Sequence, residues 1–182
     1  MNTSQKYNEK DCFRTNKLKT LQNAGINCFA EKYERTHNIS ELPSIDSNTT
    51  MSDAKNSTSQ IKLGGRLMSY RGHGKIAFAE LKDYSGEIQL AFSKSNLLLD
   101  IGDSNNLDNI VIGDEELDIY KFIEKYIDVG DIIGVEGDLF YTQKGELTLL
   151  VKNFVLLTKT INSLPEKFHG ITDAEKNLEK DI

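Results

Sequence analysis

The strongest constraint on the fold is a change of hydrophobic period at Ile61. From there, five short segments alternate apolar and polar residues as β-strands do: IKLGGRLM, KIAFAEL, EIQLAF, IIGVEGDLF and ELTLLVKNFVLL. The connections YRGHG, KDYSG and YTQKG contain glycine and fit tight hairpin turns. Between the third and fourth segments, apolar residues recur at helical spacing: Leu117, Tyr120, Ile123 and Ile127. The sequence therefore predicts a β domain with one internal helix.

Three strands, a helix-containing connection and two further strands are the order of a five-stranded Greek-key barrel of the OB-fold type. A small β-sandwich is the alternative, and the single helix between the third and fourth strands favours the barrel. We expect the barrel, mainly β with α, at residues 61–160. An N-terminal helical extension (1–42) should precede it, with a helix from an N-cap at Asp11 to a stop at Gly25.

Two compositionally biased segments interrupt this pattern. Residues 43–60 are rich in Ser, Thr and Asn and are expected to form a flexible loop. Residues 96–118 are expected to form an acidic insertion whose stretch from Asp100 to Asp118 is a solvated loop. After the barrel, residues 161–182 are expected to be a linker toward a further, catalytic domain.

The net charge of −6 is unevenly distributed. Residues 95–140 contain 2 basic and 12 acidic residues, whereas residues 1–40 and 61–94 each carry a net charge of +3. Because phosphate affinity depends on local Lys and Arg, the acidic total does not exclude a nucleic-acid partner. If the N-terminal helix extends upstream, one of its faces carries a basic stripe formed by Lys6, Lys10, Arg14 and Lys17. Such a stripe is either solvated surface or a phosphate contact, and the sequence favours neither alternative.

Other classes of protein find little support. No apolar run approaches the roughly 18 residues of a membrane-spanning helix, and the N-terminus lacks the apolar run of a signal peptide. The two cysteines are too few for a disulfide framework. The three histidines are far apart, and no GxSxG, HExxH or CxxC motif occurs. We therefore expect a cytoplasmic protein with no membrane partner and no catalytic, cofactor-binding or metal residue in this chain.

Strand parity indicates a candidate binding face. If the apolar faces of the strands fill the barrel, Arg66, Phe78 and Gln89 emerge on its outer surface. There an aromatic ring can stack on an unpaired base while an amide bonds the edge of that base. The equal alternative is that Phe78 packs under a loop or under the N-terminal helix. Arg71 and Lys75, in the turn after the first strand, add positive charge beside this face.

Four segments carry a family resemblance: YNEKDCFRTNKLKTLQNAGINCF, IKLGGRLMSYRGHGKIAFAELKDYSGEIQL, DVGDIIGVEGDLFYTQKGELTL and LLTKTINSLPEKFHGITDAE. In this order they resemble the N-terminal anticodon-binding region of the lysyl-tRNA synthetases, a class II family. The resemblance implies that the barrel reads the uridine-rich anticodon of lysine tRNA, with Phe78 stacking on the middle base and Gln89 bonding its edge. It also matches Arg71 and Glu146 to anticodon-contacting positions and Arg66 to the arginine of the first-strand motif. Lys75 and Lys17 are our additional candidate contacts.

The chain departs from the family pattern at Cys28, where proline is usual, at Ala91, where an aromatic is usual, and in its longer loops. It also lacks the class II catalytic motifs, so we expect it to be inactive in aminoacylation by itself. The resemblance leaves two alternatives, a fragment of the full enzyme or a free-standing remnant of it, and in both ATP and Mg²⁺ would belong to the missing catalytic domain. The implied partners are tRNA, lysine tRNA in particular, and a second copy of the chain or a synthetase partner. The alternatives are a general single-stranded nucleic-acid binder and a protein-interaction subunit without tRNA binding.

Overall fold

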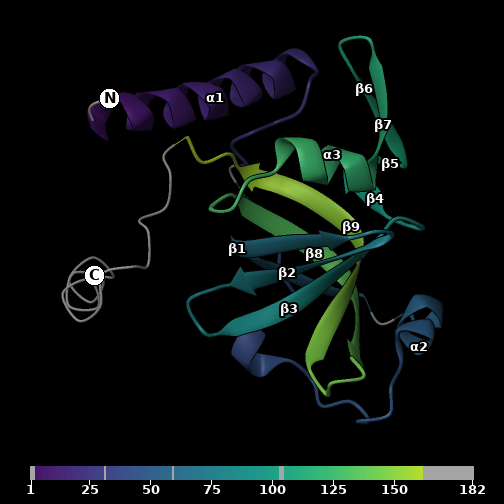
Figure 1. Ribbon diagram of the computed structural model, residues 1–182. Coiled ribbons are helices and arrows are strands. Elements are labelled where there is room, and N and C mark those ends of the chain that lie inside the picture. Colours follow the sequence, from purple (N-terminus) through teal and green to yellow (C-terminus); the bar gives the residue numbers. More distant parts are fainter. Residues whose placement is uncertain (1–2, 31, 59, 103–104, 162–182) are drawn as a thin grey trace.

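The central feature of the computed structural model, which describes residues 3–30, 32–58, 60–102 and 105–161, is a closed five-stranded barrel (Figure 1). Its strands are β1 (Ile61–His73), β2 (Ile76–Lys82), β3 (Glu87–Ser93), β8 (Ile132–Tyr141) and β9 (Leu147–Thr158). Neighbouring strands follow the order β3-β2-β1-β8-β9, and a parallel pairing of β3 with β9 closes the barrel. With the helix α3 (Ile119–Tyr126) between β3 and β8 in the chain, the expected OB-fold is confirmed.

The barrel interior holds the apolar residues that strand alternation predicts. The residues of β2 and β3 that belong to this interior core are Ala77, Ala79, Leu81, Ile88, Leu90 and Phe92. α3 adds its apolar face to the same core through Phe122 and Ile123. The helix begins at its N-cap Asp118, whose carboxylate accepts a hydrogen bond from the Lys121 amide at 2.8 Å. Leu117, which spacing had assigned to the helix, lies in the strand before it.

β1 is longer than the sequence pattern indicates and contains a β-bulge. The expected strand ends at Met68, but β1 continues to His73 and the chain reverses at Gly74, whose φ is +64°. The register with β2 shifts between Leu67 and Ser69, which inserts an extra residue into β1. As a result Arg71 is not in the turn but in the strand, directly opposite Phe78. Cross-strand partners share a face of the sheet, so the bulge brings these two side chains together.

α1 (Thr3–Asn23) begins eight residues before the expected N-cap, so Asp11 lies inside the helix. Its C-terminal end follows the expectation: Gly25 has a φ of +82°, and the amides of Gly25 and Ile26 donate to the carbonyls of Gln22 and Leu21, both at 3.0 Å. The two bonds form a Schellman motif, in which Leu21 and Ile26 are both buried. Within the N-terminal extension, apolar residues from Leu18 to Leu42 therefore pack into the same core as the barrel.

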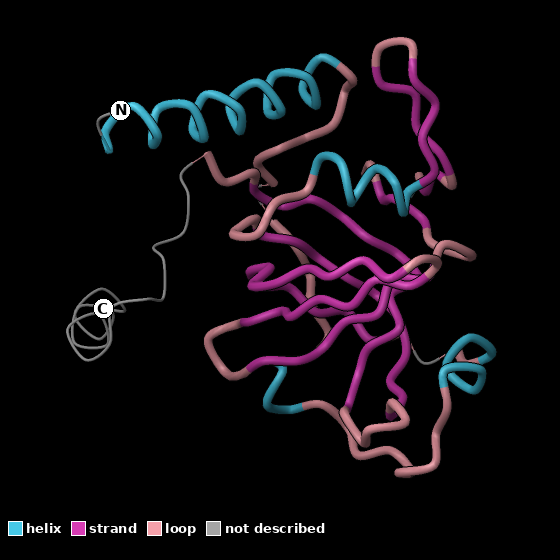
Figure 2. Tube along the Cα trace, in the orientation of Figure 1, coloured by secondary structure: helices cyan, strands magenta, loops and turns pink. Residues whose placement is uncertain are grey.

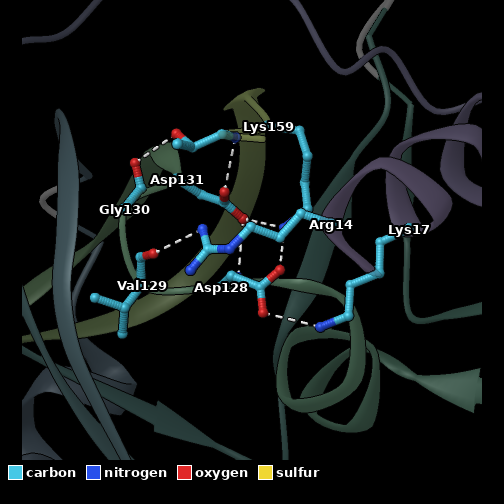
Figure 3. A network of polar contacts seen from close by, with 8 residues as sticks. Arg14, Lys17, Asp128, Val129, Gly130, Asp131 and Lys159 are labelled. Carbon is cyan, nitrogen blue, oxygen red and sulfur yellow. Dashed lines mark hydrogen bonds and ion pairs between the residues drawn. The ribbon is translucent and has the colours of Figure 1, made fainter. Parts of the chain in front are cut away.

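Polar contacts also hold α1 against one end of the barrel (Figure 3). Lys17 Nζ lies 2.8 Å from Asp128 Oδ1, and Arg14 donates to the carbonyl of Val129 at 3.3 Å. Burial raises the pKa of Asp128, but the hydrogen bonds from Lys159 and Lys17 outweigh this and hold its pKa below the usual value. Arg14 and Lys17 are thus structural contacts, and these two members of the basic stripe do not form a free surface.

Both biased segments contain regular structure. Residues 43–60 include the helix α2 (Met51–Asn56), which begins with a capping box in which Thr50 and Asp53 exchange hydrogen bonds. The expectation of a solvated loop from Asp100 to Asp118 is wrong, because short strands occupy much of this region. They are β4 (Leu98–Asp100), β5 (Asn106–Leu107), β6 (Asn109–Ile112) and β7 (Glu115–Asp118). β6 and β7 form a separate hairpin beside α3 (Figure 2), with Ile110, Ile112 and Leu117 buried.

α1 and α3 lie at one end of the barrel, whereas α2 and the β8–β9 turn lie toward the other (Figure 1). No helix in the described part of the chain is long and apolar enough to cross a membrane. Apart from Ile161, the expected linker at 161–182 lies outside the described residues. The short helix η1 (Ile39–Glu41) completes the described helices.

Candidate nucleic-acid interface

A pocket of about 870 Å³ lies on the outer face of the barrel, within the roughly 300–1,000 Å³ range of ligand sites. Its floor comes from β1, β2 and β3, and its sides come from the β8–β9 turn and the segment that enters α2. Four of the seven predicted site residues line it together: Arg71, Phe78, Gln89 and Glu146. The remaining lining includes Phe140, Tyr141 and Lys144 from the β8–β9 hairpin and the segment Ser47–Ser52.

Phe78 is both packed and exposed, so it combines the two alternatives expected from the sequence, a ring covered by another segment and a ring open to a base. It is half-buried and packs with Met51 against a small apolar cluster outside the barrel, which contains Ala54, Ala91, Phe140 and Leu150. It also faces the pocket. Packing on one side fixes the ring, and the exposed remainder is available for stacking. A held aromatic ring of this kind is a stacking platform for a base.

Gln89 and Glu146 meet at the back of the pocket. The amide nitrogen of Gln89, placed by its hydrogen-bonding partners, donates to Glu146 Oε2 at 2.7 Å and to Oε1 at 3.2 Å. A carboxylate can only accept hydrogen bonds, so Glu146 fixes the orientation of the Gln89 amide, with its NH2 group toward Glu146 and its carbonyl oxygen turned away. The pairing of β3 with β9 brings Gln89 opposite Thr148, two residues from Glu146 along the chain. Barrel closure therefore creates this pair.

Arg71 and Lys144 supply positive charge at the rim of the pocket. Both are exposed, and neither forms an ion pair with another described residue. Arg71 is held beside the Phe78 ring by the cross-strand pairing of β1 with β2. A cation next to a stacking ring suits the phosphate that follows a stacked base.

The other three predicted residues lie elsewhere. Arg66 is exposed, but its cross-strand neighbour in β2 is Lys82. Lys82 is four residues along β2 from Phe78, so Arg66 lies about 13 Å along the sheet from the stacking ring. Lys75 is exposed in the β1–β2 turn and is absent from the pocket lining. Lys17 also lies outside the pocket lining, and its ammonium group is bound to Asp128, with a side chain only 15% exposed. Sequence parity places a residue on a face but does not give its distance from another along the strand.

The segment Ser47–Ser52 is the part of the pocket that the sequence analysis did not identify. Its composition indicated a loop with nothing to bury, yet Ala54 of the following helix is almost completely buried. The T-x-x-D pattern from Thr50 to Asp53 was the available signal, because that spacing is typical of a helix N-terminus.

Among the described residues, His, Cys, Asp and Glu form no group of three or more that could hold a metal ion.

The barrel and its outer pocket together define a nucleic-acid-binding OB-fold domain. Residues 61–157 match the tRNA anti-codon family, described as an OB-fold nucleic acid binding domain, and the chain belongs to this family. Similar proteins include lysine–tRNA ligases. The chain is 39% identical to that of Carboxydothermus hydrogenoformans over 94% of its own length and 38% identical to that of Fusobacterium nucleatum over 92%. The aligned part is 30% and 29% of these relatives, so the chain spans about a third of their length.

Proposed function

We propose that this domain binds tRNA through the anticodon, and lysine tRNA in particular, as the anticodon-binding part of a lysine–tRNA ligase. The observation that carries the proposal is the convergence of Arg71, Phe78 and Gln89, from three adjacent strands, in one pocket. The similarity to lysine–tRNA ligases supports it. Under this proposal ATP and Mg²⁺ act in the catalytic part of a complete cytoplasmic ligase, and this chain needs no cofactor. That ligase would also supply the dimer partner.

Stacking on Phe78 supplies affinity, and the amide of Gln89 supplies discrimination. A base stacked on an aromatic side chain contributes about 1–3 kcal/mol, whichever base it is. Uracil presents a donor at N3 and an acceptor at O4, whereas cytosine presents the reverse pattern at N3 and N4. Because Glu146 accepts hydrogen bonds from the Gln89 NH2 group, the amide has one orientation and offers a base one pattern of donor and acceptor rather than two. A fixed amide suits the uridine of a lysine anticodon.

The test is a binding titration by fluorescence anisotropy with lysine tRNA and a tRNA of unrelated anticodon. We expect the wild type to prefer lysine tRNA and Phe78→Ala to weaken that binding about 5- to 150-fold, as loss of one stacked base implies. Phe29→Ala is the matched control, because Phe29 is 51% exposed but does not line the pocket. Equal affinity for both tRNAs with a steep salt dependence would instead indicate a general single-strand binder. No tRNA binding at all would leave a protein-interaction role.

A further inference from the structure

α2 is fixed to the outside of the barrel although it has only six residues. Ala54, on its inner face, is 1% exposed and belongs to the same apolar cluster as Ala91 of β3, which is fully buried. Both residues are alanines, so the helix can approach the sheet closely. Phe140 and Leu150, from β8 and β9, complete the contact.

Hydrogen bonds fix both ends of this segment. The Tyr141 amide donates to the Thr49 carbonyl at 3.0 Å, which joins the chain before α2 to the end of β8. Beyond the helix, Lys152 Nζ donates to the Ser57 carbonyl at 2.6 Å. The capping box of Thr50 and Asp53 holds the first turn of α2. The segment is therefore attached to the barrel at several points along its length.

The segment Ser47–Ser52 forms one wall of the pocket, with the β8–β9 turn on another side. A volume of about 870 Å³ leaves room beside a single base stacked on Phe78. The side chains of Asn48 and Ser52 are exposed and make no hydrogen bond within the described part of the chain. They offer an amide and a hydroxyl, which can donate or accept toward a base edge, a ribose hydroxyl or a phosphate.

We propose that this wall makes the pocket a two-nucleotide site, in which Asn48 and Ser52 bind the nucleotide next to the one that stacks on Phe78. The inference rests on the proposed function, since it requires RNA in the pocket. It assigns the segment that composition marks as a loop to recognition of the neighbouring nucleotide. Met51 serves both positions, because it lines the pocket and packs in the same cluster as Phe78.

The experiment measures the affinity of the full chain for a synthetic anticodon hairpin of lysine tRNA. The variant carries Asn48→Ala and Ser52→Ala. The control carries Ser44→Ala and Asn56→Ala, a matched pair of exposed residues that also lie within residues 43–60 but do not line the pocket. We expect the first variant to bind about 5- to 30-fold more weakly, the loss of two hydrogen bonds, and the control to bind as the wild type does.

Two further hairpins carry an abasic nucleotide on either side of the base that stacks on Phe78. If Asn48 and Ser52 contact that neighbour, one abasic hairpin binds the wild type and the variant equally, because the contact is already lost. Wild-type affinity in the variant, or equal losses on all three hairpins, would overturn the inference. Failure of the proposed function has a different signature, in which Phe78→Ala binds the unmodified hairpin as tightly as the wild type does.

Discussion

Lys159 and Asp131 form an ion pair in which neither side chain has exposed surface, with Nζ 2.6 Å from Oδ2 (Figure 3). Lys159 also contacts Asp128 at 2.6 Å, and Asp131 accepts hydrogen bonds from the amides of Asp128 and Thr160, each at 2.9 Å. The group joins the end of β9 to the chain that enters β8, and through Lys17 to α1. Every charge in it is paired or hydrogen-bonded, as a buried charge requires.

Replacing Lys159 with methionine should destabilise the fold strongly, because it leaves the Asp131 carboxylate buried without its cation. We expect the free energy of unfolding to fall by about 3–5 kcal/mol in urea titrations followed by circular dichroism. Lys125→Met is the control, because Lys125 and Glu115 form an ion pair with side chains 51% and 53% exposed, and its loss should be unmeasurable. Equal effects of the two substitutions would contradict the structural role of the buried pair.

The pH dependence of stability should depend in part on Asp83. Burial raises the pKa of this carboxyl, but hydrogen bonds from Ser85 and from the amides of Ile39 and Gly86 outweigh burial and lower it. A lowered pKa in the folded state means that the stabilisation is present above the unfolded value of about 3.9 and disappears as the pH falls through the folded value. Asp83→Asn should therefore cost about 1 kcal/mol at pH 7 and much less at the acid end. Denaturant titrations at several pH values check this, and an equal cost at every pH would refute it.

Gly137 should be the least replaceable glycine of the barrel. A Cβ at this position would overlap the carbonyl oxygen of Leu150, so the backbone of β8 or β9 would have to move. We expect Gly137→Ala to destabilise the domain by about 3 kcal/mol or more, measured by thermal unfolding. Gly72→Ala is the control, because its Cβ would meet only the Tyr120 hydroxyl at 3.8 Å. A similar melting temperature for the two variants would show that β8 and β9 can separate freely.

Glu146→Gln should change specificity more than affinity. A glutamine at position 146 can donate as well as accept, so it can pair with either end of the Gln89 amide and no longer fixes the orientation of that amide. We expect the preference for uridine over cytidine at the stacked position to decrease severalfold in the hairpin titration, with stacking on Phe78 retained. If the uridine preference stays while total affinity falls, Glu146 acts on the RNA directly and not through Gln89.

Much of the barrel could be predicted because it depends on local patterns. Alternation placed Leu81, Leu90 and Phe92 inside, and Gly25 marked the end of the first helix. The capping box before α2 was equally local, but the Ser- and Asn-rich composition around it pointed to a loop. Likewise Ile110 and Ile112 alternate as a strand does, yet the surrounding acidic residues suggested a solvated loop. In both segments average composition was a poorer guide than the position of a few residues.

The sequence by itself determined which strands form the barrel, which of their faces is apolar and which residue types are available for binding a base. Those properties follow from the two-residue period of a strand and from turn and cap residues that act over a few positions. Only the tertiary structure decided which of these residues meet. A bulge in β1 moved Arg71 opposite Phe78, barrel closure joined Gln89 to Glu146, and Asp128 bound Lys17 away from the pocket. The physical reason is that register, closure and ion pairing depend on contacts between residues far apart in the chain, which no local pattern encodes.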